Sequence, residues 1–251
     1  MSGTVYLVGA GPGAVELLTL RAARLLAEAE IVFHDALVPQ AILALAPQAA
    51  KIAVGKRSGR HSTAQRFINK RLADAARKHR VVVRLKGGDP MLFGRAQEEI
   101  AYLRAQAIAV EVVPGVTAAL AAAADLGVSL TQRGLARSVA FVTPRVGAGE
   151  SVSTWLQTVL AADTAAIYMG AGEAASIGKA LVAAGKLPST PAVVIENASL
   201  DQARTVRGTL SELALLAAQL GDGPALIVLG EVLRNVASAA QPATLRTRRA
   251  R

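Results

Sequence analysis

The amino-acid sequence predicts an α/β fold made of two α/β domains. The first observation is that short apolar runs typical of strands alternate with longer amphipathic runs typical of helices. The second is that several strand-like runs end in glycine-rich turns. The third is a composition with 52% apolar but only 3% aromatic residues, which suits small side chains packed closely between helices and a sheet. A chain of 251 residues is long enough for one large domain or two smaller ones.

The first half of the chain predicts a parallel sheet. Runs rich in Val, Ile and Leu predict strands at 4–9, 30–35, 80–85 and 109–113. Apolar residues at helical spacing predict helices at 14–28 and 62–79, and Ser62 and Gln65 have the spacing of a capping box at the start of the second. Strands that alternate with helices in this way are typically parallel, with the helices as crossover connections.

The second half predicts a mixed sheet. The Val-Pro-Gly step at 113–115 interrupts the alternation, and an alanine-rich helix is predicted at 116–126. Strands are predicted at 138–143, 164–169, 192–196, 205–210 and 225–230, with fewer long helices between them. We therefore predict an N-terminal domain at 1–114, a C-terminal domain at 115–240 and a basic, disordered tail at 241–251.

Charge and composition narrow the classes of function. The net charge is +10, and the tail contributes four arginines, whose plainest interpretation is a solvated, disordered segment. A basic protein can bind nucleic acid or attract an acidic small molecule, but scattered arginines and few aromatic residues argue against nucleic acid. The three histidines lack metal-site spacing and cysteine is absent, so no metal site is predicted. Neither a secretory signal nor a membrane span is predicted, which favours a cytoplasmic protein.

The first glycine-rich turn supports two interpretations. Gly9, Gly11 and Ala14 match the G-x-G-x-x-A pattern of dinucleotide-binding folds, and Asp35 stands where a ribose-binding acid would lie. Pro12 argues against an NAD site, because proline lacks the N–H that would face a pyrophosphate. The plainer alternative is a tight turn between a strand and a helix.

A second glycine-rich turn follows the strand at 80–85. Gly87 and Gly88 carry no Cβ, so either a ligand approaches the main chain there or the chain adopts a positive φ. Asp89 could accept hydrogen bonds from a ligand amine or hydroxyl, and Pro90 restricts the turn. The turn lies at the carboxyl end of a strand, where open α/β sheets bind ligands. A plain Gly-Asp-Pro turn is the alternative.

Seven motifs in order extend the argument from single turns to almost the whole chain. They are VYLVGAGPG, VGKR, VVRLKGGDPMLFGR, EVVPGVTAA, LTQR, IYMG and RGTL, within about residues 4–234. Together they resemble the tetrapyrrole methylase family, and the LKGGDP-x-x-FGR form resembles its uroporphyrinogen III methylases. The resemblance implies a homodimer, a cofactor cleft between two α/β domains, and conversion of uroporphyrinogen III to precorrin-2 by two methyl transfers. It also implies a role in cobalamin or sirohaem synthesis.

The resemblance further implies which residues contact the cofactor, S-adenosylmethionine. They are Pro12, Gly87, Gly88, Asp89, Leu92, Thr117, Ala118, Met169 and Ala198. Ala198 stands where the family usually has glycine, so its φ must be negative or its contact looser. A sulfonium nucleoside needs no row of N–H donors, which removes the objection that Pro12 raises.

Five further residues match positions that act on the tetrapyrrole. The resemblance implies that Asp35 is a proton acceptor and Lys56 a proton donor. Arg95 and Arg133 would bind substrate carboxylates, and Glu98 would hold Arg95 from the next helical turn. Taken without the resemblance, these residues are more simply a strand-end acid, solvated side chains and a surface ion pair.

Several departures from the family pattern keep other functions open. Ala96 and Gln97 replace two glycines, and Gln132 replaces a common histidine. One alternative is a sibling methylase that acts on a later corrin intermediate. Another is a protein that binds the cofactor or a tetrapyrrole without catalysis.

Overall fold

The computed structural model describes residues 2–54, 65–147 and 153–237. These residues form two compact units, and the chain passes from the first to the second between Ala118 and Ala119. The Val-Pro-Gly step of the sequence predicts this boundary near Pro114. Each unit is described separately below.

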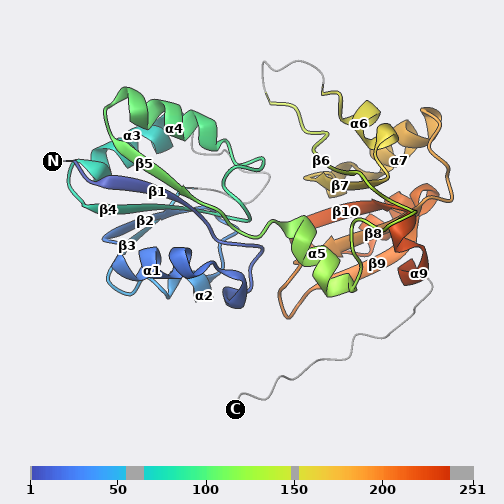
Figure 1. The fold of residues 1–251 in the computed structure, drawn as a ribbon, viewed down its shortest axis with the longest axis horizontal. Helices are drawn as coiled ribbons and strands as arrows, with labels where there is room; N and C mark the ends of the chain where they lie inside the picture. The colour runs from blue at the N-terminus through green and yellow to red at the C-terminus, as the bar shows by residue number, and fades with distance from the viewer. Residues whose placement is uncertain (1, 55–64, 148–152, 238–251) are drawn as a thin grey trace, which may run out of the picture. The chain divides into compact units, whose positions relative to one another are not determined.

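The first unit contains a parallel sheet, as predicted, with five strands where four were predicted. Its strands are β1 (Thr4–Gly9), β2 (Ile31–His34), β3 (Ala50–Ala53), β4 (Val81–Lys86) and β5 (Ala109–Val113), in the spatial order β3-β2-β4-β1-β5 (Figure 1). β3 has only four residues and was not predicted, because its sequence AKIA has little of the Val and Ile enrichment typical of strands. The order puts β1 between β4 and β5, so the turns that follow these three strands are neighbours.

Helices cover both faces of this sheet. α1 (Leu20–Glu28) and α2 (Gln40–Leu43) lie on one face, and α3 (Gln65–Ala76) and α4 (Ala96–Ala105) on the other (Figure 1). The helix predicted at 14–28 is interrupted. A 3-10 turn, η1 (Val15–Leu17), precedes Thr19, whose hydroxyl caps α1 by accepting a hydrogen bond from Ala22 N at 3.1 Å. Ser62 of the predicted capping box lies outside the described residues.

The second unit contains the predicted mixed sheet, with the spatial order β6-β7-β10-β8-β9. Its strands are β6 (Val139–Val142), β7 (Thr164–Tyr168), β8 (Pro191–Glu196), β9 (Arg204–Thr209) and β10 (Ala225–Gly230). β6 and β7 are parallel, whereas the other neighbouring pairs are antiparallel. Because β7 and β8 are both antiparallel to β10, and β9 and β10 are both antiparallel to β8, the connections from β6 to β7, from β7 to β8 and from β9 to β10 all join parallel strands and need crossovers.

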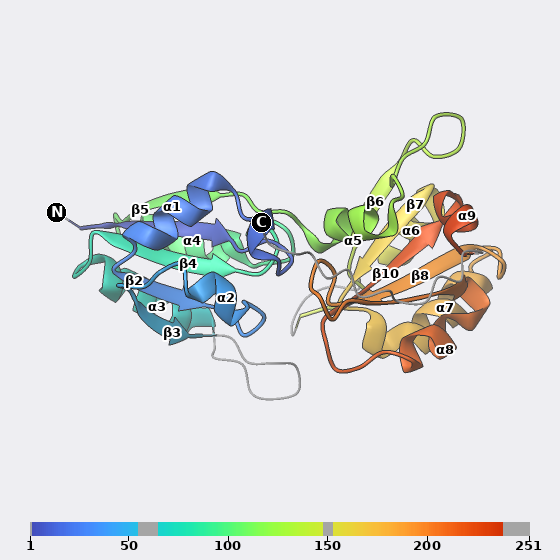
Figure 2. The same ribbon diagram turned by 90° about the horizontal axis from the view of Figure 1, so that it is seen from below.

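Helices also cover both faces of the second sheet. α6 (Trp155–Ala161), α7 (Ala174–Ala183) and α8 (Leu213–Ala218) pack on one face through a common apolar core. α5 (Ala118–Leu126) and α9 (Arg234–Ala237) lie on the other face (Figures 1 and 2). Short 3-10 turns, η2 (Ala171–Glu173), η3 (Leu210–Glu212) and η4 (Glu231–Leu233), precede α7, α8 and α9. None of the helices in the described parts of the chain is long and apolar enough to cross a lipid bilayer.

Candidate functional site

Three turns meet at the carboxyl edge of the first sheet. They follow β1 (residues 9–13), β4 (residues 87–90) and β5 (residues 114–117), and together we call them the glycine edge. Two backbone hydrogen bonds join the first two turns, from Gly88 N to Gly11 O at 2.7 Å and from Gly11 N to Gly88 O at 3.2 Å. The two glycine-rich motifs of the sequence, separated by more than seventy positions, therefore form one structural feature.

Backbone contacts explain why the glycine edge excludes side chains. A Cβ on Gly9 would lie 2.6 Å from Gly115 Cα and 2.7 Å from Gly88 O. A Cβ on Gly115 would likewise lie 2.9 Å from Gly9 Cα. Gly88 also has a φ of +66°, a conformation that favours glycine. The three turns are in direct backbone contact, and larger residues at Gly9 or Gly115 would separate them.

Gly87 is less closely packed than Gly9 and Gly115. Its surroundings indicate whether a ligand could approach the main chain there. It is exposed, and among the described residues the only heavy atom within 4 Å of an added Cβ would be Leu37 Cβ at 3.9 Å. For its neighbour Gly88, the only described atom this close would be Thr117 Cα at 3.9 Å. Packing against the described residues therefore does not require glycine at position 87. An exposed backbone without a side chain, at the carboxyl edge of a parallel sheet, lies where open α/β sheets bind ligands.

Asp89 holds the glycine edge together. Its Oδ1 accepts a hydrogen bond from Met91 N at 2.8 Å, and its Oδ2 accepts one from Gly115 N at 2.9 Å. The carboxylate thus closes its own turn and ties it to the turn after β5. A carboxylate has about four acceptor positions, so a ligand donor can still be accommodated. The sequence predicted an acceptor for a ligand and missed this bond to a distant turn.

The remaining predicted cofactor contacts of the first unit lie on or beside the same edge. Pro12 is half-buried in the first turn, Thr117 is buried in the third, and Ala118 follows it at the start of α5. Leu92 is half-buried, and its N donates to Asp89 O at 3.3 Å. The fold thus brings together these residues and the Gly87-Gly88-Asp89 turn.

Asp35 lies at the carboxyl end of β2, beside β4. Its Oδ1 accepts a hydrogen bond from Arg84 Nη2 at 2.5 Å, while 31% of its side chain stays exposed. Arg84 is buried and also donates from Nε to Glu99 Oε1 at 3.1 Å. Glu99 accepts from Lys86 Nζ at 3.1 and 3.2 Å. Asp35, Arg84, Glu99 and Lys86 form a connected set that we call the buried charge network.

Sequence reasoning missed three members of the buried charge network. Arg84, Lys86 and Glu99 are 3%, 4% and 0% exposed, so their charges are desolvated and must be paired. The available signal was the alternation in VVVRLK, because residues 84 and 86 point to one face of a strand that is otherwise apolar. Burial lowers the pKa of Lys86, the charge of Arg84 lowers it further, and Glu99 and Asp35 oppose these effects in part.

Arg95 and Glu98 are in contact at the start of α4. Arg95 Nε donates to Glu98 Oε1 at 2.7 Å, and Arg95 Nη2 donates to Glu98 Oε2 at 2.8 Å. Both side chains are at least half exposed, and this hydrogen bonding lowers the pKa of the Glu98 carboxyl. The guanidinium is therefore held in one orientation at the protein surface. Its predicted role toward a substrate carboxylate stays a prediction.

Two of the three predicted residues of the second unit, Met169 and Arg133, are exposed, whereas Ala198 is buried. Met169 follows β7 with a φ of 56° and is 46% exposed, and Arg133 lies in an exposed turn closed by hydrogen bonds between Gln132 and Ala136. Ala198 is buried and has a negative φ, although Asn197 and Ser199 on either side have φ values of 54° and 73°. The alanine that replaces the usual glycine thus fits its backbone conformation. Lys56 lies outside the described residues.

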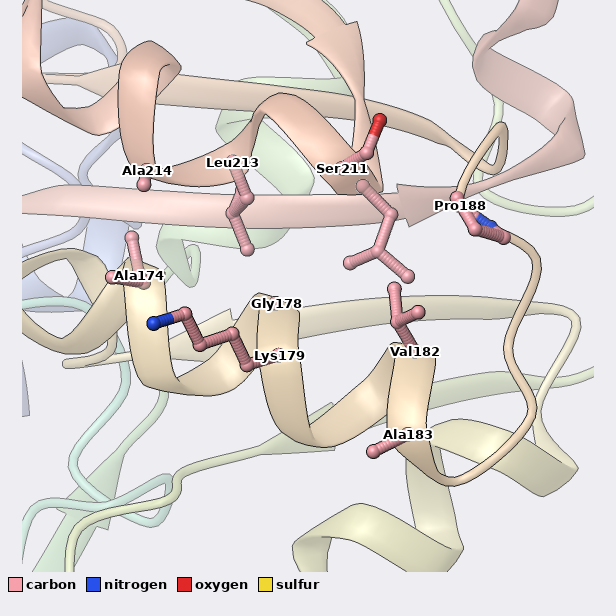
Figure 3. Close-up of a pocket in the computed structure, with 11 residues that line it drawn as sticks. Ala174, Gly178, Lys179, Val182, Ala183, Pro188, Ser211, Leu213 and Ala214 are labelled. Carbon is pink, nitrogen blue, oxygen red and sulfur yellow. The ribbon is translucent and has the colours of Figure 1, made fainter.

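A pocket of about 540 Å³ on the second unit contains none of the predicted site residues. It lies between α7 and the segment from η3 to α8, whose side chains face each other across it (Figure 3). Its lining is apolar apart from Lys179 and Ser211. The described residues contain no group of three or more His, Cys, Asp or Glu side chains that could bind a metal ion. The glycine edge and the buried charge network therefore form the candidate site.

Comparison with known protein families points in the same direction. A sequence profile of the Tetrapyrrole (Corrin/Porphyrin) Methylases matches residues 4–214. The glycine edge, Asp35 and the buried charge network all lie within this match.

Individual relatives cover nearly the whole chain. A uroporphyrinogen-III C-methyltransferase of Pseudomonas aeruginosa is 45% identical over 246 residues, which are 98% of this chain and 99% of the relative. A siroheme synthase of Chromobacterium violaceum is 46% identical over 92% of this chain, which spans about half of that longer protein. The crystal structure of a uroporphyrin-III C-methyl transferase from Thermus thermophilus, complexed with S-adenyl homocysteine, is 44% identical. The two structures superpose with a TM-score of 0.82. The match covers 93% of this chain and 100% of the Thermus thermophilus chain.

Proposed function

Because the chain belongs to the tetrapyrrole methylase family, we propose that it methylates ring carbons of uroporphyrinogen III with S-adenosylmethionine. The product would be precorrin-2, formed through precorrin-1 by two successive methyl transfers. The observation that carries the proposal is the 45% identity to a uroporphyrinogen-III C-methyltransferase along almost its entire length. The glycine edge supports it, because the exposed backbone of Gly87 lies at the carboxyl edge of the sheet, where open α/β sheets bind ligands.

The residues of the glycine edge would hold the cofactor. Gly87 and Gly88 let it approach the main chain, Asp89 keeps the turns together, and Pro12, Leu92, Thr117 and Ala118 complete the contacts in the first unit. Met169 and Ala198 are the contacts proposed in the second unit. When bound, S-adenosylmethionine supplies an activated methyl group on a sulfonium sulfur. The protein's task is to orient this group toward the attacking ring carbon.

Other residues would act on the tetrapyrrole. Methylation of a ring carbon leaves a proton to be removed from a neighbouring bridge carbon, and Asp35 is the proposed acceptor. Its exposed edge allows access, while Arg84 holds one of its oxygens. Arg95 and Arg133 would bind substrate carboxylates, with Glu98 orienting Arg95. Lys56 is proposed as the proton donor, on the resemblance alone.

The test of this function is incubation of the purified protein with uroporphyrinogen III and S-adenosylmethionine without oxygen. We expect about two equivalents of S-adenosylhomocysteine per macrocycle, with the product identified as precorrin-2 by absorbance and mass. Folded protein that binds the cofactor but releases no S-adenosylhomocysteine would favour the non-catalytic alternative. Turnover of a precorrin but not of uroporphyrinogen III would favour the sibling methylase.

The assembly and the location of the enzyme also belong to the proposal. We propose a homodimer, on the resemblance to the family, and a cytoplasmic location. Light scattering during size-exclusion chromatography tests the homodimer. The chain spans about half the length of the siroheme synthases it resembles.

Gly87→Ala is expected to weaken cofactor binding without destabilising the fold. Its φ is not in the left-handed region, and among the described residues an added methyl group would meet only Leu37 at 3.9 Å, so the free energy of unfolding should change by less than about 0.5 kcal/mol. The same methyl group would occupy the space proposed for the cofactor. We expect the Kd for S-adenosylhomocysteine, measured by calorimetry, to rise about tenfold.

Gly172→Ala is the matched control for this experiment. Gly172 is exposed, and no atom of the described residues lies within 4 Å of an added Cβ. This variant should keep both stability and affinity. An unchanged Kd in Gly87→Ala would place the cofactor elsewhere.

Arg95→Lys is expected to lower kcat/KM for uroporphyrinogen III about tenfold, with the fold intact. Lysine keeps the positive charge but cannot form the two-pronged contact that a guanidinium makes with a carboxylate. Arg77→Lys is the control, because Arg77 is also an exposed arginine paired with an acid three residues away in the sequence. Steady-state kinetics would measure kcat/KM for both variants. Equal values for Arg95→Lys and Arg77→Lys would show that Arg95 is not part of the substrate site.

A further inference from the structure

We infer that Glu99 is a positioning residue, which through Arg84 sets the orientation of the Asp35 carboxylate. The inference rests on the role proposed for Asp35 in proton removal. Glu99 itself is completely buried, so it acts on the reaction only through the groups it contacts.

Glu99 is the centre of the buried charge network. Its Oε1 accepts hydrogen bonds from Arg84 Nε at 3.1 Å, Lys86 Nζ at 3.2 Å and Gln65 Nε2 at 3.0 Å, and its Oε2 accepts one from Lys86 Nζ at 3.1 Å. Donors thus reach it from β4 and from α3, while α4 carries the carboxylate itself. A carboxylate at this depth is stable only with such partners. These hydrogen bonds fix the position of the Glu99 carboxylate, and the carboxylate in turn fixes the positions of the side chains that donate to it.

Arg84 connects Glu99 to Asp35 at the carboxyl edge of the sheet. Its Nε is bound to Glu99, its Nη1 donates to Leu85 O at 3.2 Å, and its Nη2 donates to Asp35 Oδ1 at 2.5 Å. The guanidinium is planar, so holding one side fixes the direction of the opposite side. With Nε unpaired, the guanidinium could rotate, and the contact to Asp35 would lose its direction.

Charge balance in the network leads to the same assignment. The charged groups are Arg84 and Lys86 from β4, Glu99 from α4 and Asp35 after β2, while Gln65 and Asn69 from α3 are neutral. Removing the charge of Glu99 leaves two buried cations and Asp35 as the only acid. Asp35 would then be drawn into pairing with buried cations instead of presenting its exposed edge.

A double-mutant cycle tests the inference. The variants are Asp35→Asn, Glu99→Gln and the two combined, with kcat for methyl transfer and the Kd for S-adenosylhomocysteine measured for each. We expect kcat to fall about 100-fold in Asp35→Asn and about tenfold in Glu99→Gln. If Glu99 acts through Asp35, the double variant should lose no more than Asp35→Asn alone. The Kd should stay near that of the unmodified protein, because the glycine edge is unchanged.

The other outcomes each have a definite meaning. A loss of about 1000-fold in the double variant, the product of the single losses, would assign Glu99 an independent structural role and overturn the inference. An unchanged kcat in Asp35→Asn would overturn both the inference and the role of Asp35, while methyl transfer itself would still stand. If the unmodified protein transferred no methyl group, the proposed function would fail first.

Two further variants guard against misfolding and general effects. If Glu99→Gln does not fold, Arg84→Lys replaces it in the cycle, because lysine keeps the charge but cannot contact Glu99 and Asp35 in one plane. Asp74→Asn removes an exposed carboxylate of α3 that pairs with Arg77, just after the end of this helix. It should leave kcat and Kd unchanged, and a loss there would show that the assay responds to surface charge in general.

Discussion

Gly9→Ala should destabilise the first unit by about 3 kcal/mol, because no space exists for the added methyl group. The new Cβ would lie 2.6 Å from both Gly115 N and Gly115 Cα and 2.7 Å from Gly88 O. All three are backbone atoms, which cannot rotate away as the end of a flexible side chain can. The turns after β1, β4 and β5 would have to separate, and with them the proposed cofactor site.

Denaturant unfolding followed by circular dichroism would measure this loss, and calorimetry would measure the expected loss of S-adenosylhomocysteine binding. Gly172→Ala again serves as the control, because it makes the same chemical change where no atom of the described residues is close. A Gly9→Ala variant with unchanged stability and affinity would show that the three turns are not packed as described.

Asp89→Ala should raise the Kd for S-adenosylhomocysteine about thirtyfold, equivalent to about 2 kcal/mol. The change removes the acceptors of Met91 N and Gly115 N, which lie 2.8 and 2.9 Å from the carboxylate. The turn after β4 would lose both its internal closure and its link to the turn after β5. Any direct bond from a cofactor hydroxyl or amine would be lost as well.

Asp89→Asn separates these contributions. Its amide oxygen can still accept from one backbone N–H, whereas its NH2 group would face the other donor, so we expect an intermediate Kd. Asp201→Ala, at an exposed acid of the second unit, is the control and should bind normally. Calorimetry that found the same Kd for Asp89→Ala and the unmodified protein would exclude Asp89 from the cofactor site.

Local patterns predicted much of the fold. The strands at β1, β5 and β10 match the predicted residues, since short apolar runs bounded by turn residues identify strands well. Predictions were poorer where periodicity is weak or broken. β3 is short and largely exposed, and the helix predicted at 14–28 is divided at Thr19, whose hydroxyl begins a new helix.

The sequence predicted the glycine-rich turns of the candidate site but not its buried charge network. The glycine-rich turns are visible because glycine has a distinct backbone role, and their meeting follows from the carboxyl edge that parallel strands share. Arg84, Lys86 and Glu99 resemble ordinary charged residues until their burial is known. Arg84 contacts Asp35 across 49 positions of sequence and Glu99 across 15, and such pairing has no local signature.

The sequence by itself therefore determined the α/β class, the parallel and mixed sheets, the glycine-rich turns and membership of the family. These depend on periodicity, backbone freedom and ordered motifs, which are properties of neighbouring residues. Only the tertiary structure decided that Asp89 ties two turns together and that Glu99 holds Arg84 against Asp35. Desolvation and hydrogen-bond geometry arise when distant segments pack, so they are determined by the folded arrangement of the chain.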